Sequence, residues 1–192
     1  MNAPRFVRRT MERLGDMWII ARTFFLRTDT GRWKRNAREL PAWDDRNRLF
    51  ASLIPPGSSV LDLGAGAQTL RGYLVDCEYQ PCDVVEGEGV LFCDYNRDLY
   101  PAVTKPYDFV VCSGVLEYIR EPRVFLGRVF SLGKQGLLSY AYLRPAETKV
   151  KRMKQGWVNH LAQTELEGLF TALNLKWSLL DTWNHQLIYR IG

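Results

Sequence analysis

The sequence predicts an α/β fold: a doubly wound, mostly parallel seven-stranded sheet with an antiparallel last strand. From residue 44 onward, short runs of β-branched and aliphatic residues alternate with helical segments, which is typical of a sheet with helices on both faces. The run YDFVVCSG at 107–114 is continuously apolar, which favours a central strand in a parallel sheet. The last two predicted strands are joined by a short turn at Asn184, so they must run antiparallel.

The elements follow from local patterns in chain order. The first helix of this alternation begins with an Asp cap and ends before a Pro-Pro pair. Pro81 interrupts the second strand, which leaves the start of that strand open. The last helix begins with Thr164 as cap and Glu167 three residues on, a capping-box pattern. Helices are predicted at 44–53, 67–76, 122–132 and 164–175, and strands at 58–64, 78–85, 89–94, 107–114, 136–142, 176–183 and 185–191.

Charge divides the chain into a basic N-terminal helical arm, residues 1–43, and a globular domain, residues 44–192. Residues 1–38 hold ten Lys and Arg against three acidic residues, a net charge of +7, whereas the remainder holds sixteen basic and eighteen acidic residues, a net charge of −2. A loop is expected over 27–43, with its turn residues and a Pro. Apolar residues recur along the arm at alternating steps of four and three, which predicts an amphipathic helix: Val7, Met11, Leu14, Trp18, Ala21 and Phe25.

The apolar stripe of the arm must be buried against something, and the sequence of residues 5–27 leaves three possibilities. These are the domain itself, a second copy of the chain, and an anionic membrane surface on which the arm lies peripherally. Ile19, Ile20 and Phe24 widen the apolar face beyond a narrow stripe. This width favours protein cover over a membrane.

Composition argues against several kinds of site and compartment. No apolar run reaches the roughly 18 residues of a membrane span, and charged residues interrupt the N-terminus where a secretory signal needs an apolar core. We therefore expect a cytoplasmic protein. No CxxC spacing occurs and the chain has two histidines, so no metal site is expected. The cysteines are interpreted as small core residues in a reducing compartment: Cys77, Cys82, Cys93 and Cys112.

The segment VLDLGAG at 60–66 points to a ligand. Asp62 lies near the carboxyl end of the first strand, where ligands bind in such sheets, and GAG forms the turn that follows. Gly64 and Gly66 allow backbone to approach a ligand closely, so a nucleotide-like ligand is expected against Gly64, Ala65 and Gly66. A buried carboxylate without a partner is costly, so Asp62 is expected to face a positive group of that ligand.

The carboxylate of Asp62 distinguishes between two candidate cofactors. A dinucleotide-binding loop has a third glycine where this chain has Thr69, and Asp62 would repel a pyrophosphate. S-adenosylmethionine carries an ammonium and a sulfonium and has no phosphate, so it fits Asp62. Asp83 ends the second strand and can accept hydrogen bonds from both ribose hydroxyls. Asp94 ends the third strand, where it can accept from the adenine amino group.

The chain resembles the class I S-adenosylmethionine-dependent methyltransferases. The resemblance rests on VLDLGAG, Asp83, CDYN at 93–96 and YDFVVCSGVLEYI at 107–119, and it covers residues 44–192. It implies the Rossmann-like methyltransferase fold, with its seven-stranded sheet and final hairpin, and S-adenosylmethionine as cofactor. This chain departs from the family at Gln68, where a third glycine is frequent. The implied cofactor-binding residues are Asp62, Gly64, Ala65, Gly66, Asp83, Asp94, Tyr95, Ser113 and Gly114.

Structural roles stay open for several of these residues. Asp83 can cap a strand end, Asp94 can cap the following turn, and 113–117 can be a strand-to-helix turn. For catalysis, methyl transfer to oxygen benefits from a general base. His160 is predicted in that role, from the segment where the family often builds its acceptor pocket, with Glu117 as second candidate. His185 is interpreted as a strand residue, and Tyr140 and Tyr142 are expected near the pocket.

The leading functional hypothesis is methyl transfer to a small polar acceptor, with a sugar or glycan-precursor hydroxyl favoured by analogy with the family. A small-molecule acceptor is therefore the expected partner. One alternative is a non-catalytic binding or scaffold protein on the same fold, and a less favoured one is a nucleic-acid methyltransferase. Because residues 39–192 have a net charge of −2, nucleic acid is not expected as a partner.

Overall fold

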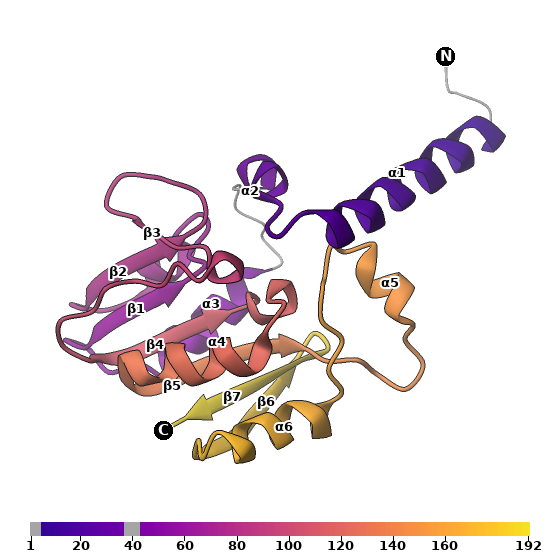
Figure 1. Ribbon diagram of the computed structural model, residues 1–192. Coiled ribbons are helices and arrows are strands. Elements are labelled where there is room, and N and C mark those ends of the chain that lie inside the picture. The colour runs from indigo at the N-terminus through magenta and orange to yellow at the C-terminus, as the bar shows by residue number, and fades with distance from the viewer. Residues whose placement is uncertain (1–4, 37–42) are drawn as a thin grey trace.

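The computed structural model describes residues 5–36 and 43–192 (Figure 1). Within these residues, seven strands form one sheet in the order β3-β2-β1-β4-β5-β7-β6. Strands β1 to β5 pair in parallel, and β7 is antiparallel to both β5 and β6. The predicted α/β fold and mostly parallel seven-stranded sheet are confirmed. The strands are β1 (Ser59–Leu63), β2 (Glu78–Asp83), β3 (Leu91–Phe92), β4 (Tyr107–Ser113), β5 (Gly133–Ala141), β6 (Trp177–Trp183) and β7 (Gln186–Ile191).

Helices cover both faces of this sheet, as expected for a doubly wound fold. Side chains of α4 and α6 form one core with the sheet, and side chains of α3 form a second core on the opposite face. Because side chains alternate along a strand, the neighbours Val110 and Val111 of β4 enter opposite cores. The helices are α1 (Arg5–Phe25), α2 (Thr30–Asn36), α3 (Asp44–Ser52), α4 (Pro122–Val129), α5 (Lys149–Met153) and α6 (Gln163–Ala172).

Helix α1 extends away from the sheet and meets the rest of the molecule near its C-terminal end, beside α5 (Figure 1). No helix in the described ranges is long and apolar enough to cross a membrane. Helix α2 lies within 27–43, where the sequence predicts a loop, so that prediction is wrong for 30–36. The remaining part of this predicted loop at 37–42 lies outside the described residues, as do residues 1–4 of the arm.

Two elements near the glycine turn are shorter than predicted. Segment 67–76 is not an α-helix and holds only a 3₁₀ turn, Thr69–Tyr73. Gln68 precedes this turn with a left-handed φ of 57°, and Gly72 lies within it, so an α-helix has neither a regular start nor a good helix former there. The strand predicted at 89–94 joins the sheet only over β3.

Three local predictions differ from the structure: two concern helix caps and one concerns His185. The Asp cap of α3 does not form: Trp43 is the cap residue and makes no side-chain cap bond, while the aspartates lie in the first turn. Helix α6 begins at Gln163, and Glu165, rather than Glu167, accepts the cap amide of Ala162 at 2.6 Å. His185 lies in the turn between β6 and β7 with a φ of 64°. It is therefore not a strand residue.

The cysteine prediction is corrected. Cys82 of β2 and Cys93, just after β3, form a disulfide, with Cα atoms 6.1 Å apart. The parallel pairing of β2 with β3 brings the two side chains together, and the amide of Cys93 donates to the carbonyl of Asp83. Cys77 and Cys112 are free thiols, and Cys112 is buried, as expected for a core cysteine.

Candidate active site

A cavity of about 400 Å³ opens at the carboxyl ends of β1, β2 and β4. Small-molecule sites have volumes in this range, and ligands of open α/β sheets bind at this edge. Glu117, one of the two predicted catalytic residues, lines the cavity. So does every residue predicted to bind the cofactor: Asp62, Gly64, Ala65, Gly66, Asp83, Asp94, Tyr95, Ser113 and Gly114. Their shared placement is established, and their individual roles stay predictions.

The glycine turn after β1 is held in one shape by backbone contacts. The amides of Gly64 and Ala65 both donate to the carbonyl of Cys82, at 2.7 and 3.2 Å. Gly64 and Gly66 have left-handed φ angles of +70° and +52°, which glycine adopts without strain. The turn therefore presents backbone to the floor of the cavity, with no side chain at positions 64 and 66.

Asp62 is a buried carboxylate at the centre of this floor. The hydroxyl of Tyr79 donates to its Oδ2 at 2.6 Å. Burial raises the pKa of Asp62 to about 6, and the nearby charge of Asp83 adds to that rise, while Tyr79 and the cation of Arg46 oppose it. A ligand cation placed beside Asp62 would restore its ionised form.

This shift predicts a pH-dependent affinity for S-adenosylhomocysteine, whose ammonium favours the ionised form of Asp62. The ionised fraction grows as pH rises through 6, so binding should strengthen in that direction, by about tenfold between pH 5 and pH 7. Calorimetric titrations across this range measure the effect. Asp62→Asn should bind weakly with a nearly flat pH profile, and a flat profile in the unmodified protein would contradict the prediction.

Asp83 fixes the glycine turn at the end of β2. Its Oδ2 accepts the amide of Gly66 and its Oδ1 accepts the amide of Val85, both at 2.8 Å. Each carboxylate oxygen keeps a further lone pair for a ligand. Asp83 therefore both organises the loop and remains able to bind a ribose diol.

Asp94 lines the cavity just beyond the end of β3. It makes no side-chain cap bond to the following turn, so the capping alternative is not observed. Instead, Thr28 donates to its Oδ1 at 2.6 Å and Arg97 lies 3.2 Å from its Oδ2. Thr28 belongs to the arm, and both Thr28 and Trp33 line the cavity. The predicted division at residues 43 and 44 thus leaves part of the site on the arm side.

Arg46 lines the cavity, although the sequence analysis did not predict it as a site residue. It lies on α3, is nearly fully buried, and lines the cavity beside Gly114. Its Nη1 donates to Gln186 at 2.9 Å, while its buried Nε has no partner. Its position four residues before buried Phe50 places it on the inward face of the helix, which is the signal that could have identified it. A buried guanidinium here can bind a ligand carboxylate.

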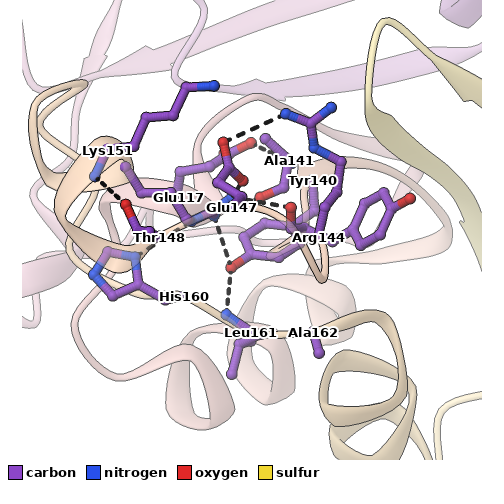
Figure 2. A network of polar contacts seen from close by, with 12 residues as sticks. Glu117, Tyr140, Ala141, Arg144, Glu147, Thr148, Lys151, His160, Leu161 and Ala162 are labelled. Carbon is purple, nitrogen blue, oxygen red and sulfur yellow. Dashed lines mark hydrogen bonds and ion pairs between the residues drawn. The ribbon is translucent and has the colours of Figure 1, made fainter.

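Glu117 and Ser113 line the cavity, and each carries a buried side-chain oxygen without a protein partner. Glu117 Oε1 accepts the amide of Ala141 at 2.7 Å, a contact drawn in Figure 2. Its Oε2 and the hydroxyl of Ser113 are buried without a protein partner. Burial raises the pKa of Glu117. Buried polar atoms are rarely left unpaired, so each of these two atoms is expected to meet an ordered water or a ligand.

His160 is not brought to the cavity. It belongs to a polar network that also holds Tyr140 and extends to Glu117 (Figure 2), and neither His160 nor Tyr140 is among the described residues that line the cavity. Arg152 donates to His160 Nδ1 at 3.3 Å. Burial lowers the pKa of His160, and the charges of Arg152 and Lys149 lower it further. Tyr142 does not line the cavity either. Arg152, fully buried against carbonyls of 141 and 142, ties this segment together.

An aromatic wall forms another side of the cavity. Trp33 and Tyr118 pack edge to face with ring centroids 4.5 Å apart, and Trp157 Nε1 donates to the Tyr118 hydroxyl at 3.1 Å. All three line the cavity together with the cofactor-site candidates. Tryptophan and tyrosine offer an apolar face next to a hydrogen-bonding group, so this wall can hold an amphipathic acceptor.

The chain matches a known protein family. The family model described as "Methyltransferase domain" matches residues 32–182 of this chain. The chain belongs to the methyltransferase domain family. The predicted family and enzyme class are thereby confirmed, and the match begins within the arm, close to Trp33. A search of curated proteins found no match to this sequence.

Solved structures share the fold of this methyltransferase. One is the Burkholderia thailandensis 1,6-didemethyltoxoflavin-N1-methyltransferase with bound 1,6-didemethyltoxoflavin and S-adenosylhomocysteine, at a TM-score of 0.61 and 15% identity, covering 100% of this chain and 92% of that chain. A methyltransferase of calicheamicin biosynthesis, also bound to S-adenosylhomocysteine, has a TM-score of 0.56 and 16% identity, covering 78% of this chain and 54% of that chain. The predicted cofactor agrees with both.

A third neighbour of this methyltransferase has a protein partner. Its structure is a complex with a Haloferax volcanii methyltransferase activator, and it has a TM-score of 0.57 and 14% identity, covering 90% of this chain and 96% of that chain. Identities at this level show a common fold. The acceptor must therefore be argued from the residues of this chain.

Proposed function

We propose that this methyltransferase transfers the methyl group of S-adenosylmethionine to a hydroxyl of a small polar acceptor, with a sugar or glycan precursor as the favoured class. The observation that carries the proposal is the makeup of one cavity. It combines the cofactor-site candidates with the aromatic wall of Trp33, Tyr118 and Trp157 and with the unpartnered Oε2 of Glu117. A hydroxyl acceptor needs a proton acceptor, and Glu117 provides one.

The residues present fit this cofactor. Asp62 offers an anion to the ammonium, and Arg46, with a free buried Nε, offers a cation to the carboxylate. Asp83 would accept from the ribose hydroxyls and Asp94 from the adenine amino group. The glycine turn, which carries no side chain at 64 or 66, lets the ligand lie against backbone. When bound, the cofactor supplies a methyl group that is already activated for displacement.

Positioning is the main contribution expected of this chain. An in-line displacement gains most of its rate from holding the two reactants in the correct geometry, and the aromatic wall would hold the acceptor. Glu117 Oε2 would take the hydroxyl proton as the new carbon–oxygen bond forms and the carbon–sulfur bond breaks. Because burial raises the pKa of Glu117, its carboxylate is a stronger base than an exposed glutamate.

A labelling experiment tests the proposed function itself. The purified protein is incubated with S-adenosylmethionine carrying a labelled methyl group and with fractions of a cell extract, and labelled products are identified by mass spectrometry. The expected product is a methyl ether on a small polar molecule. Labelling confined to nucleic acid, or labelling on nitrogen or carbon, would reject the proposed acceptor class.

Glu117 and His160 can be distinguished as bases once the acceptor is known. Glu117→Gln keeps an oxygen that can accept the Ala141 amide and removes the base, so turnover should fall by roughly 10²–10⁴-fold with a small change in S-adenosylhomocysteine affinity. His160→Gln should retain near-normal turnover, because His160 does not line the cavity. The reverse pattern would assign the base to His160 and reject Glu117.

A further inference from the structure

Helix α1 carries a continuous apolar face that the rest of the described chain leaves open. Trp18 is 64% exposed and Phe25 is 86% exposed. At about 100° per residue, the exposed apolar residues span an arc of roughly 140° around the helix, as wide as the buried stripe of an ordinary surface helix. They are Met11, Leu14, Met17, Trp18, Phe24 and Phe25. The domain does not cover this face, so of the three covers that the sequence left open, the second copy of the chain and the membrane surface remain.

The opposite side of α1 is attached to the body. Asp16 forms an ion pair with Lys154 at 2.7 Å, just beyond α5. The guanidinium of Arg120 donates to the carbonyls of Thr23, Leu26 and Arg27 at the end of the helix. Helical spacing places Asp16 and Thr23 on the side away from Trp18 and Phe25. The body therefore holds the helix with its apolar face outward, as the direction of α1 in Figure 1 allows.

Charge selects the occupant of this face. Residues 1–38 have a net charge of +7, from ten basic and three acidic residues, whereas the remaining chain has a net charge of −2. Two such arms placed face to face would bring like charges together, which disfavours a second copy of the chain. A bilayer with anionic lipids attracts clustered Lys and Arg and also accepts apolar side chains, and Trp is favoured at the level of its headgroups.

We propose that α1 docks this enzyme peripherally on an anionic lipid bilayer, with its outward apolar face inserted at the headgroup level. No described helix is long and apolar enough to span a membrane, so the helix lies in the surface. The chain leaves α1 at Phe25 and reaches the cavity at Thr28 and Trp33. Docking therefore brings one wall of the cavity within a few residues of the bilayer. This inference does not depend on which acceptor is methylated.

The test measures co-sedimentation of the full chain with vesicles of phosphatidylcholine alone and with phosphatidylglycerol added. Binding is expected only with the anionic lipid, and it should fall at least tenfold between 50 and 500 mM salt. Trp18→Glu combined with Phe25→Glu should reduce binding more than tenfold. A matched control, Val75→Glu combined with Val124→Glu, changes two exposed apolar residues of the body and should leave binding intact.

Two further measurements keep the outcome clear. The melting temperature of the Trp18 and Phe25 variant should match that of the unmodified protein, because both side chains are exposed. Light scattering reports the mass in solution. Equal binding to neutral and anionic vesicles would overturn the proposal. So would a dimer that the variant converts to monomers while vesicles are ignored, because that result assigns the face to a second copy.

Discussion

Replacing Gly64 by alanine is expected to abolish detectable S-adenosylhomocysteine binding. Gly64 has a φ of +70°, where a Cβ costs about 1–2 kcal/mol, and that Cβ would overlap Cγ2 of Val115. Val115 is β-branched and stiff and also lines the cavity, so relief of the overlap must move either the glycine turn or the opposite wall. We expect affinity to fall by at least a hundredfold, about 3 kcal/mol, in calorimetry.

Gly57→Ala is the matched control for this change. Gly57 has a similar φ of +77°, but a Cβ there meets no atom within 4 Å, and the residue lies before β1, away from the cavity. This variant should lose stability from the same backbone strain and keep its affinity. If Gly57→Ala and Gly64→Ala weaken binding equally, the effect comes from general destabilisation, and the glycine turn is not the ligand floor.

Asp83→Ala is expected to have the second-largest effect on cofactor binding. The change removes a carboxylate placed for the ribose hydroxyls and also releases the amides of Gly66 and Val85. Hydrogen bonds that involve a charged group contribute about 1.5–3 kcal/mol, so we expect affinity to fall roughly 10- to 150-fold. Calorimetry with S-adenosylhomocysteine measures the change.

Asp108→Ala provides the comparison for Asp83. Asp108 also accepts a backbone amide, that of Ser59 at 2.9 Å, and it pairs with Lys134 at 2.8 Å, but at the opposite end of the strands. The contact with Lys134 is the main cause of its lowered pKa. This variant should melt at a lower temperature with unchanged affinity. Unchanged affinity in Asp83→Ala as well would place the ribose carboxylate elsewhere.

The sequence was sufficient for the sheet and for the placement of the cofactor-site candidates along one cavity, because both depend on short-range pattern. Strands with β-branched residues identify themselves, and the ends of parallel strands meet at one edge. Asp62, Asp83 and Asp94 each lie at or near the end of such a strand, so their convergence could be predicted from the order of strands alone. Asp62 could also be interpreted as a ligand contact, because a carboxylate inside an apolar strand needs a compensating partner.

Tertiary contacts decided the features that the sequence left open. Arg46 becomes a site residue only because α3 packs over the end of β4, and the local pattern of α3 marks it as inward-facing without giving its destination. The bond between Cys82 and Cys93 depends on the register of β2 and β3, which spacing does not reveal. His160 was predicted from its place along the chain, but it bonds to buried Arg152 and does not line the cavity.

The disulfide has a consequence for how the ligand site is assembled. Strand β3 has two residues, too few to hold a fixed position by pairing alone. Cys82 and Cys93 each come directly before one of the carboxylates, Asp83 and Asp94, so the covalent bond sets the spacing between the backbones that carry them. The conformational entropy of ordering this half of the site is therefore lost during folding and oxidation. The half of the site proposed to bind adenosine is preorganised, so less of the interaction free energy would go into ordering it when the ligand arrives.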